Sequence, residues 1–285
     1  MADWMFVDGS SLIFRAFFGV PTSMRSPDGK PINGVRGFMD RLATLIVEHR
    51  PVRLAVASDE DWRPGWRVEL IPSYKAHRVA EPIPPQLEPQ MPIIDDVLKA
   101  AGVDFVGVAD FEAEDVIASW TARAAGQTVD IVSGDRDLFA LVRDPHVRVL
   151  YPEKRGLTVI DEAEVTRRYG VPGRLYADFA ILRGDPSDGL PGLMGVGDKK
   201  AAELVSRYDG IEGLMGSGRL KDAERDYLER ARRVVPPVAD IAIELPQGRR
   251  ERYPDDPERV VTLAERYGLD GPFERLLRAL ELLKA

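Results

Sequence analysis

The sequence contains no cysteine and only three histidines among its 285 residues. The lack of cysteine excludes disulfide bonds, thiolate metal sites and thiol nucleophiles. His49, His77 and His146 are scattered, so no pair has the spacing of a histidine zinc site. A metal site in this chain must therefore be built from oxygen ligands.

Long apolar runs are also missing. The N-terminal segment MADWMFVDGSSLIFRAFFGV has an acid where a signal peptide has a basic region, and Arg15 interrupts its apolar run. We therefore expect neither a signal peptide nor a membrane-spanning segment. The lack of cysteine suits a reducing, cytoplasmic location.

Positive charge is in deficit, with 39 Lys and Arg against 47 Asp and Glu and a net charge of −8. Taken alone, this balance argues against a nucleic-acid partner. The 44% hydrophobic and 30% charged composition is typical of a globular chain. Its length suits one large α/β domain, or a core domain with a smaller companion.

Short apolar runs alternate with helical stretches in the first half of the chain. This alternation predicts a mostly parallel sheet covered by helices. Near residue 178 the pattern changes to helices joined by short turns, so we predict a core at 1–178 and a second, helical region at 179–285. The predicted strands are Trp4 to Val7, Leu54 to Ala57, Phe105 to Val108, Val129 to Val132 and Val147 to Tyr151.

Carboxylates cluster at five places in apolar or glycine-marked contexts. An Asp after a single strand more often forms a turn or caps a helix, and acids at a helix start are common. Five such places exceed that need, and the carboxyl ends of parallel strands share one edge of a sheet. Converging carboxylates require cations, and oxygen ligation selects Mg²⁺ or Mn²⁺, which in pairs promote phosphodiester cleavage. The nine candidate ligands are Asp8, Asp59, Glu112, Glu114, Asp115, Asp135, Asp137, Asp185 and Asp188.

A glycine-rich segment has the features of a phosphate-binding turn. Gly192, Gly195 and Gly197 allow a close approach of the backbone, and Lys199 and Lys200 follow at the start of a predicted helix. Lysines at a helix N-terminus oppose the helix dipole, which favours a role in binding. A helix C-cap followed by a turn gives a similar pattern.

Aromatic and basic residues alternate just before a proline-rich, acidic segment, EPIPPQLEPQMP. Tyr74, Lys75 and Arg78 offer a stacking face with two cations, which suits unpaired nucleotides and phosphates. A solvated helix face or a packed aromatic residue is the alternative. The proline-rich segment predicts an excursion from the sheet. The same pairing of aromatic and basic residues occurs at Trp62, Arg63, Trp66 and Arg67.

Taken in order, these motifs resemble the 5′ nuclease family of flap endonucleases and 5′–3′ exonucleases, which includes the N-terminal domain of bacterial DNA polymerase I. The resemblance rests on VDGSSLIFRAFF, YKAHR, FEAEDVIAS, SGDRDLFALV and ILRGDPSDGLPGLMGVGDKKAAEL, and spans nearly the whole chain. It implies a PIN-like sheet, a helical arch at about residues 70–95 and a helix-3-turn-helix module. It also implies cleavage of 5′-flap, gapped, nicked or RNA-primed DNA in primer removal and repair.

The resemblance also implies a division of the acids between two metal ions. Asp8, Asp59, Glu112 and Glu114 would surround one ion, and Asp135, Asp137, Asp185 and Asp188 the other, with Asp115 nearby. The segment SDEDWRPGWR is one residue longer than the family pattern, so Asp61 is an alternative ligand to Asp59.

For the cations, the resemblance implies that Lys75, assisted by Arg78, acts on the scissile phosphate at the base of the arch. A K⁺ ion at the turn from Gly192 to Gly197 would contact duplex DNA, with Lys199 and Lys200 on phosphates. The resemblance implies a stand-alone monomer that works alongside a DNA polymerase.

Two alternatives stay open, a PIN-type ribonuclease and a catalytically silent binder of branched DNA. The net charge excludes none of them. Without the nine predicted ligands, 38 acids face 39 bases, so the acid excess matches the predicted site in size. DNA binding would then rely on local basic surfaces.

Overall fold

The computed structural model describes residues 1–80, 83–154 and 156–283. It contains a six-stranded sheet in the order β3-β2-β1-β4-β5-β6. The first five strands in the sequence are parallel, as predicted, and the last runs antiparallel to its neighbour. The strands are β1 (Trp4–Asp8), β2 (Arg53–Ala57), β3 (Asp104–Val106), β4 (Val129–Val132), β5 (Val147–Glu153) and β6 (Gly156–Ile160).

The sixth strand, β6, is not predicted by the sequence pattern. It lies at the edge of the sheet and pairs only with β5. Its residues GLTVI show little apolar alternation, and Val159 is exposed. An edge strand buries only part of one face, so its sequence signal is weak.

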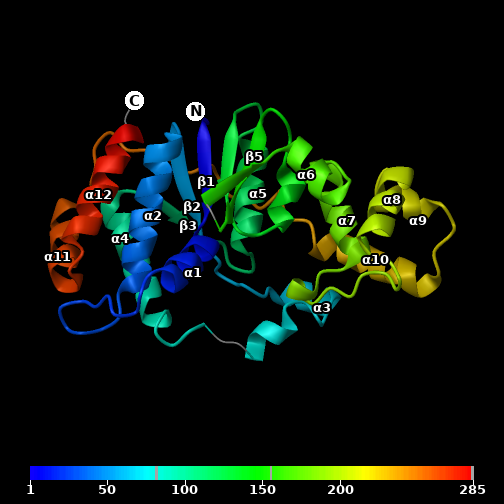
Figure 1. The fold of residues 1–285 in the computed structure, drawn as a ribbon, viewed down its shortest axis with the longest axis horizontal. Coiled ribbons are helices and arrows are strands. Elements are labelled where there is room, and N and C mark those ends of the chain that lie inside the picture. The colour runs from blue at the N-terminus through cyan, green and yellow to red at the C-terminus, as the bar shows by residue number, and fades with distance from the viewer. Residues whose placement is uncertain (81–82, 155, 284–285) are drawn as a thin grey trace.

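Helices cover both faces of the sheet (Figure 1). The 3₁₀ helices are η1 (Ala76–Ala80), η2 (Glu88–Gln90), η3 (Asp137–Leu141), η4 (Gly173–Leu175), η5 (Pro186–Asp188) and η6 (Glu281–Leu283). The α-helices are α1 (Gly9–Gly19), α2 (Asn33–His49), α3 (Gly65–Leu70), α4 (Met91–Ala101), α5 (Ala113–Arg123), α6 (Glu162–Tyr169), α7 (Tyr176–Arg183), α8 (Asp198–Tyr208), α9 (Ile211–Gly216), α10 (Asp222–Val234), α11 (Pro257–Tyr267) and α12 (Asp270–Leu280).

Two apolar cores lie on opposite faces of the sheet, because successive side chains of a strand point to opposite sides. From β1, Phe6 packs on Trp120 of α5, with ring centroids 5.3 Å apart. Met5 belongs to the other core, which contains Phe38 of α2. Fully burying each such side chain is worth about 1.5–3 kcal/mol, and this fixes the strand ends that carry the acids.

The second region shares a core with the first. Leu214 of α9 and Leu228 of α10 belong to the same apolar cluster as Trp120. The predicted boundary near residue 178 lies inside α7, so the chain has no linker there. The helices α8, α9 and α10 extend to one side of the sheet (Figure 1).

The last two helices differ from the predicted grouping. Instead of joining the helical region, α11 and α12 pack against α4 and α2 of the core, at the opposite end of the molecule (Figure 1). Arg250 ties the preceding segment to the start of β3 by donating to Asp104 at 2.7 Å. Apolar residues on one helical face predict that a helix packs, but do not say on which surface.

The predicted arch at about 70–95 is only partly helical. Short 3₁₀ turns, η1 and η2, and the first turn of α4 lie within it, joined by irregular segments. Residues 81–82 of this prediction lie outside the described residues. Within the described part of the chain, no helix is both long and apolar enough to cross a membrane.

Candidate metal centre

The ends of the central parallel strands bring acidic side chains to one edge of the sheet. Asp8 is the last residue of β1, Asp59 follows β2, and Asp135 follows β4. Asp59 and Asp135 both raise the pKa of Asp8 through their charges, so the three groups lie close together. The predicted convergence at this edge is therefore present.

The tightest group consists of Glu114, Asp135 and Asp137, each with a carboxylate oxygen within 4.8 Å of the others. Glu114 comes from the first turn of α5, while Asp137 begins η3. The backbone holds this loop in place, since the N–H of Asp137 donates to Asp135 Oδ1 at 2.9 Å. Ser133 connects the loop to β1, because its hydroxyl donates to Asp8 Oδ2 at 2.5 Å.

Three buried carboxylates at this edge of the sheet, those of Asp8, Glu114 and Asp137, have a raised pKa. Burial and the charge of Asp59 raise the pKa of Asp8 to about 7. Burial and neighbouring carboxylates raise the pKa of Glu114 and of Asp137 well above its ordinary value. Buried carboxylates without matching cations carry this electrostatic cost, and a divalent ion removes it. The all-oxygen donor set therefore fits Mg²⁺ or Mn²⁺.

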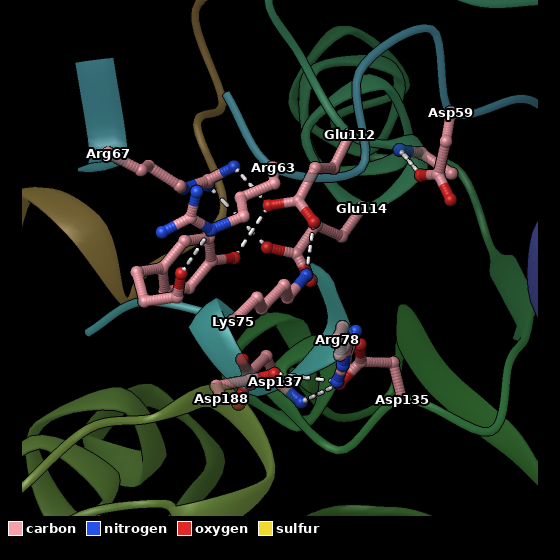
Figure 2. Close-up of polar contacts among 12 residues, drawn as sticks. Asp59, Arg63, Arg67, Lys75, Arg78, Glu112, Glu114, Asp135, Asp137 and Asp188 are labelled. Carbon is pink, nitrogen blue, oxygen red and sulfur yellow. Dashed lines mark hydrogen bonds and ion pairs between the residues drawn. The ribbon is translucent and has the colours of Figure 1, made fainter. Parts of the chain in front are cut away.

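Of the two candidates near β2, Asp59 occupies the better position. Its Oδ1 accepts the N–H of Ala113 at the start of α5 at 2.7 Å (Figure 2), and its charge acts on Asp8. Asp61 instead accepts the N–H of Arg63 at 3.0 Å within its own turn.

Two further acids, Asp185 and Asp188, are buried at η5, and arginines face both of them. Asp185 Oδ2 accepts Arg183 at 3.0 Å and Arg136 at 3.2 Å. Asp188 Oδ1 accepts Arg78 at 2.8 Å. Burial raises the pKa of Asp188, and the charges of Asp135 and Asp185 raise it further. These two acids therefore interact electrostatically with the group formed by Glu114, Asp135 and Asp137.

Asp115 differs from the prediction that places it beside a metal. Its side chain is fully buried and accepts two hydrogen bonds from Arg67, both at 2.7 Å. Its oxygens also accept the N–H groups of Glu112 at 3.1 Å and Val238 at 2.8 Å. With its oxygens occupied by these donors, Asp115 supports the start of α5.

Tyr74 also requires a correction, because it is 2% exposed and has no face available to a nucleotide. Its hydroxyl donates to Glu112 Oε2 at 2.6 Å. Arg67, which the sequence pattern placed with the stacking residues, is equally buried. The same sequence pattern, an aromatic residue next to cations, occurs in DNA-facing loops and in buried ion clusters. The sequence alone therefore does not distinguish these two environments.

Lys75 lies where the predicted arch meets the acidic group. Its ammonium pairs with Glu112 (Figure 2). Burial alone would lower the pKa of Lys75, but the charges of Glu112, Glu114 and Asp188 outweigh it and raise that pKa, so the side chain is cationic. Its backbone adopts a left-handed conformation with a φ of 47°, and its N–H donates to the carbonyl of Asp188 at 2.9 Å. Such a conformation persists only where its surroundings enforce it.

The glycine turn lies on the surface between η5 and α8. Gly192 has φ +67°, and a Cβ there would lie 2.5 Å from the backbone N of Gly184, so only glycine fits. Gly195 has φ +72°, and its surroundings are open. Lys199 and Lys200 are exposed in the first turn of α8, and no ion pair to either is found in the described chain.

Family models for 5′–3′ exonucleases match this chain in two parts. The N-terminal resolvase-like domain matches residues 3–170, and the C-terminal SAM fold matches residues 171–243. A Streptomyces coelicolor protein named 5′-3′ exonuclease is 48% identical over 97% of this chain and 99% of its own length. A Mycobacterium tuberculosis protein of the same name is 44% identical over 97% of each.

A solved structure shares the fold at low sequence identity. The bacteriophage T5 flap endonuclease, in a complex with DNA and metal ions, superposes with a TM-score of 0.69 and 17% identity. The match covers 98% of both chains.

Proposed function

This chain belongs to the 5′–3′ exonuclease family, and on that premise we propose that it is a Mg²⁺- or Mn²⁺-dependent nuclease acting on 5′-flap, gapped, nicked or RNA-primed DNA. One observation carries the proposal. Glu114, Asp135 and Asp137 have carboxylate oxygens within 4.8 Å of one another; Glu114 and Asp137 are buried, Asp135 is half-buried, and Lys75 lies at the edge of the group. This arrangement supports a site for divalent cations, and in our proposal the ammonium of Lys75 meets the approaching phosphate.

Two or more ions are expected, because the acids extend beyond the central group. Divalent ions at such a site supply charge for an incoming phosphate and make water more acidic. The residues that would hold them are Asp8, Asp59, Glu112, Glu114, Asp135, Asp137, Asp185 and Asp188.

The cations of the chain have their own tasks in this proposal. Lys75 and Arg78 bind and orient the phosphate at the cut site, and each leaves a carboxylate partner, Glu112 or Asp188, to do so. Charge-assisted bonds to phosphate are comparable with those to carboxylate, so the exchange costs little.

The glycine turn would hold the duplex. Gly192, Gly195 and Gly197 allow the backbone to approach a phosphate, directly or through a K⁺ ion, and Lys199 and Lys200 add positive charge. These contacts read the backbone and not the bases, so selectivity would come from DNA shape. The T5 neighbour is itself a complex with DNA and metal ions, which supports a DNA substrate for this chain.

The proposal extends to the compartment, the oligomeric state and the partner of the protein. The absence of cysteine favours a reducing compartment such as the cytoplasm. In line with the family resemblance, we propose a monomer that works alongside a DNA polymerase.

The test is cleavage of a labelled 5′-flap substrate with Mg²⁺ and with Mn²⁺. Wild type should cleave, while Asp135→Asn and Asp185→Asn should lose most of the activity. Asp256→Asn is the matched control, because Asp256 caps α11 far from the site and asparagine caps equally well. Flap binding in EDTA without cleavage in either metal would identify a silent binder, and a preference for single-stranded RNA would identify a ribonuclease.

A further inference from the structure

Arg67 is a completely buried arginine where α3, α5 and α10 meet. Its guanidinium donates to Glu112 Oε2 and to both oxygens of Asp115, each at 2.7 Å. It lies 3.5 Å from Glu114 Oε1 (Figure 2). The remaining donor, Nε, reaches the carbonyl of Val234 at 3.0 Å. Each nitrogen of the guanidinium therefore donates a hydrogen bond to one of these partners.

Val234 is the last residue of α10, the helix that closes the second module, defined here as α8 to α10. The chain that leaves α10 is held along α5 by further bonds. The N–H of Val238 donates to Asp115 Oδ1 at 2.8 Å, and Ser119 donates to the carbonyl of Val238 at 3.0 Å. Arg67 is thus the charged centre of the joint between the second module and α5.

The same joint carries two of the predicted metal ligands. Glu112 caps α5 and Glu114 lies in its first turn. Glu112 Oε2 accepts Arg67 and Tyr74, while its other oxygen pairs with Lys75. A shift of Arg67 would therefore move Glu112, and Lys75 with it.

A buried ion cluster contributes little net stability compared with apolar residues of equal volume, because desolvation offsets the attraction. Arg67 therefore adds little to the stability of the fold, and its main contribution is to the geometry of its partners. Its planar guanidinium bonds two carboxylates and one carbonyl at the same time, which a lysine cannot do.

We propose that Arg67 is a positioning residue for the nuclease reaction, which sets the carboxylates of Glu112 and Glu114 through its bond to the end of α10. The placement of the acidic group then depends on how the second module is seated. This inference rests on the metal-dependent cleavage proposed above.

The test is Arg67→Lys, which keeps the charge and loses the fork. Partners that orient metal ligands typically change metal affinity or rate by about 10- to 100-fold. We expect kcat on flap DNA to fall by about that factor and Mn²⁺ affinity, followed by electron paramagnetic resonance of the free ion, to weaken about tenfold. KM for the flap and duplex affinity in EDTA should stay within about threefold, because Lys199 and Lys200 are not disturbed.

Arg250→Lys is the matched control. Arg250 also forms a paired contact, with Asp104, but lies at the C-terminal segment away from the acids. We expect its kcat and Mn²⁺ affinity to equal those of wild type.

Asp115→Asn provides a second variant if Arg67→Lys does not fold, since it keeps the shape and removes one charge of the joint. It should lower kcat and Mn²⁺ affinity by a smaller factor than Arg67→Lys and leave KM and duplex affinity unchanged. Unchanged kcat and Mn²⁺ affinity in the variants that fold would overturn the inference, as would a loss that appears equally in duplex affinity. Failure of wild type to cleave would instead count against the proposed function.

Discussion

Asp8 gives the sharpest quantitative prediction, because its carboxylate is buried in the acidic group. The pKa of Asp8 lies at about 7, against an ordinary value of 3.8, owing first to burial and then to Asp59. At about 1.36 kcal/mol per pH unit, ionising Asp8 costs the metal-free folded state about 4 kcal/mol. Asp8→Asn should remove that cost.

The sign follows from proton binding. Between pH 3.8 and 7 the folded state keeps a proton that the unfolded state has lost, so stability falls as the pH rises and then levels off above pH 7. The variant should therefore gain little near pH 4 and most at pH 8. Asparagine still caps α1 as Asp8 does, by accepting the N–H of Ser11, so the gain should not be offset by a lost cap.

The assay is urea unfolding in EDTA at pH 4.5 and pH 8, with wild type measured alongside. We expect Asp8→Asn to be more stable by about 2–4 kcal/mol at pH 8, and inactive when Mg²⁺ is added. A gain that is equal at both pH values would refute the electrostatic reasoning, as would no gain at all. Saturating Mn²⁺ should stabilise wild type more than the variant.

Three further predictions concern the cations and the base of the arch. Lys75→Ala should lower the cleavage rate about 100- to 1000-fold and leave duplex affinity in EDTA unchanged. The control is Lys99→Ala, which removes an exposed lysine paired with Asp95. Equal losses of rate and duplex affinity in Lys75→Ala would contradict a role on the scissile phosphate. Lys199→Ala should reduce the slope of log affinity against log salt by about 0.9, measured by fluorescence anisotropy on duplex DNA, and an unchanged slope would show that Lys199 does not touch phosphate. Gly189→Ala should lower the thermal midpoint and the cleavage rate, because the new Cβ would lie 2.0 Å from the carbonyl O of Ser73. Gly218→Ala is the control, because Gly218 has the same φ of +70° but open space around it. Equal effects of the two changes would show that only backbone strain matters.

The convergence of acids could be predicted from the sequence for a topological reason. Parallel strands must end at the same edge of the sheet, so Asp8, Asp59 and Asp135 lie along one edge in any such fold. They are neighbours here because β1 lies between β2 and β4. The start of α5 at Glu112 can also be predicted from the sequence, because acidic residues in the first turn of a helix are a local signal.

The partners of those acids could not be predicted in the same way. Arg67 meets Glu112 and Asp115 across 45 and 48 residues of sequence, and nothing local separates this buried cation from a surface one. Tyr74 was misassigned for the same reason, since its burial depends on Glu112. The predicted roles of Lys199 and Lys200 on phosphate stay predictions.

The proposed function depends on divalent metal bound by Glu114, Asp135 and Asp137 and the acids around them. The most direct measurement is anomalous diffraction from a crystal of the wild-type protein equilibrated with Mn²⁺. We expect an anomalous peak within bonding distance of carboxylate oxygens of Glu114, Asp135 and Asp137, and a second peak among the neighbouring acids. Absence of a peak there, in protein that cleaves flap DNA at the same Mn²⁺ concentration, would contradict it.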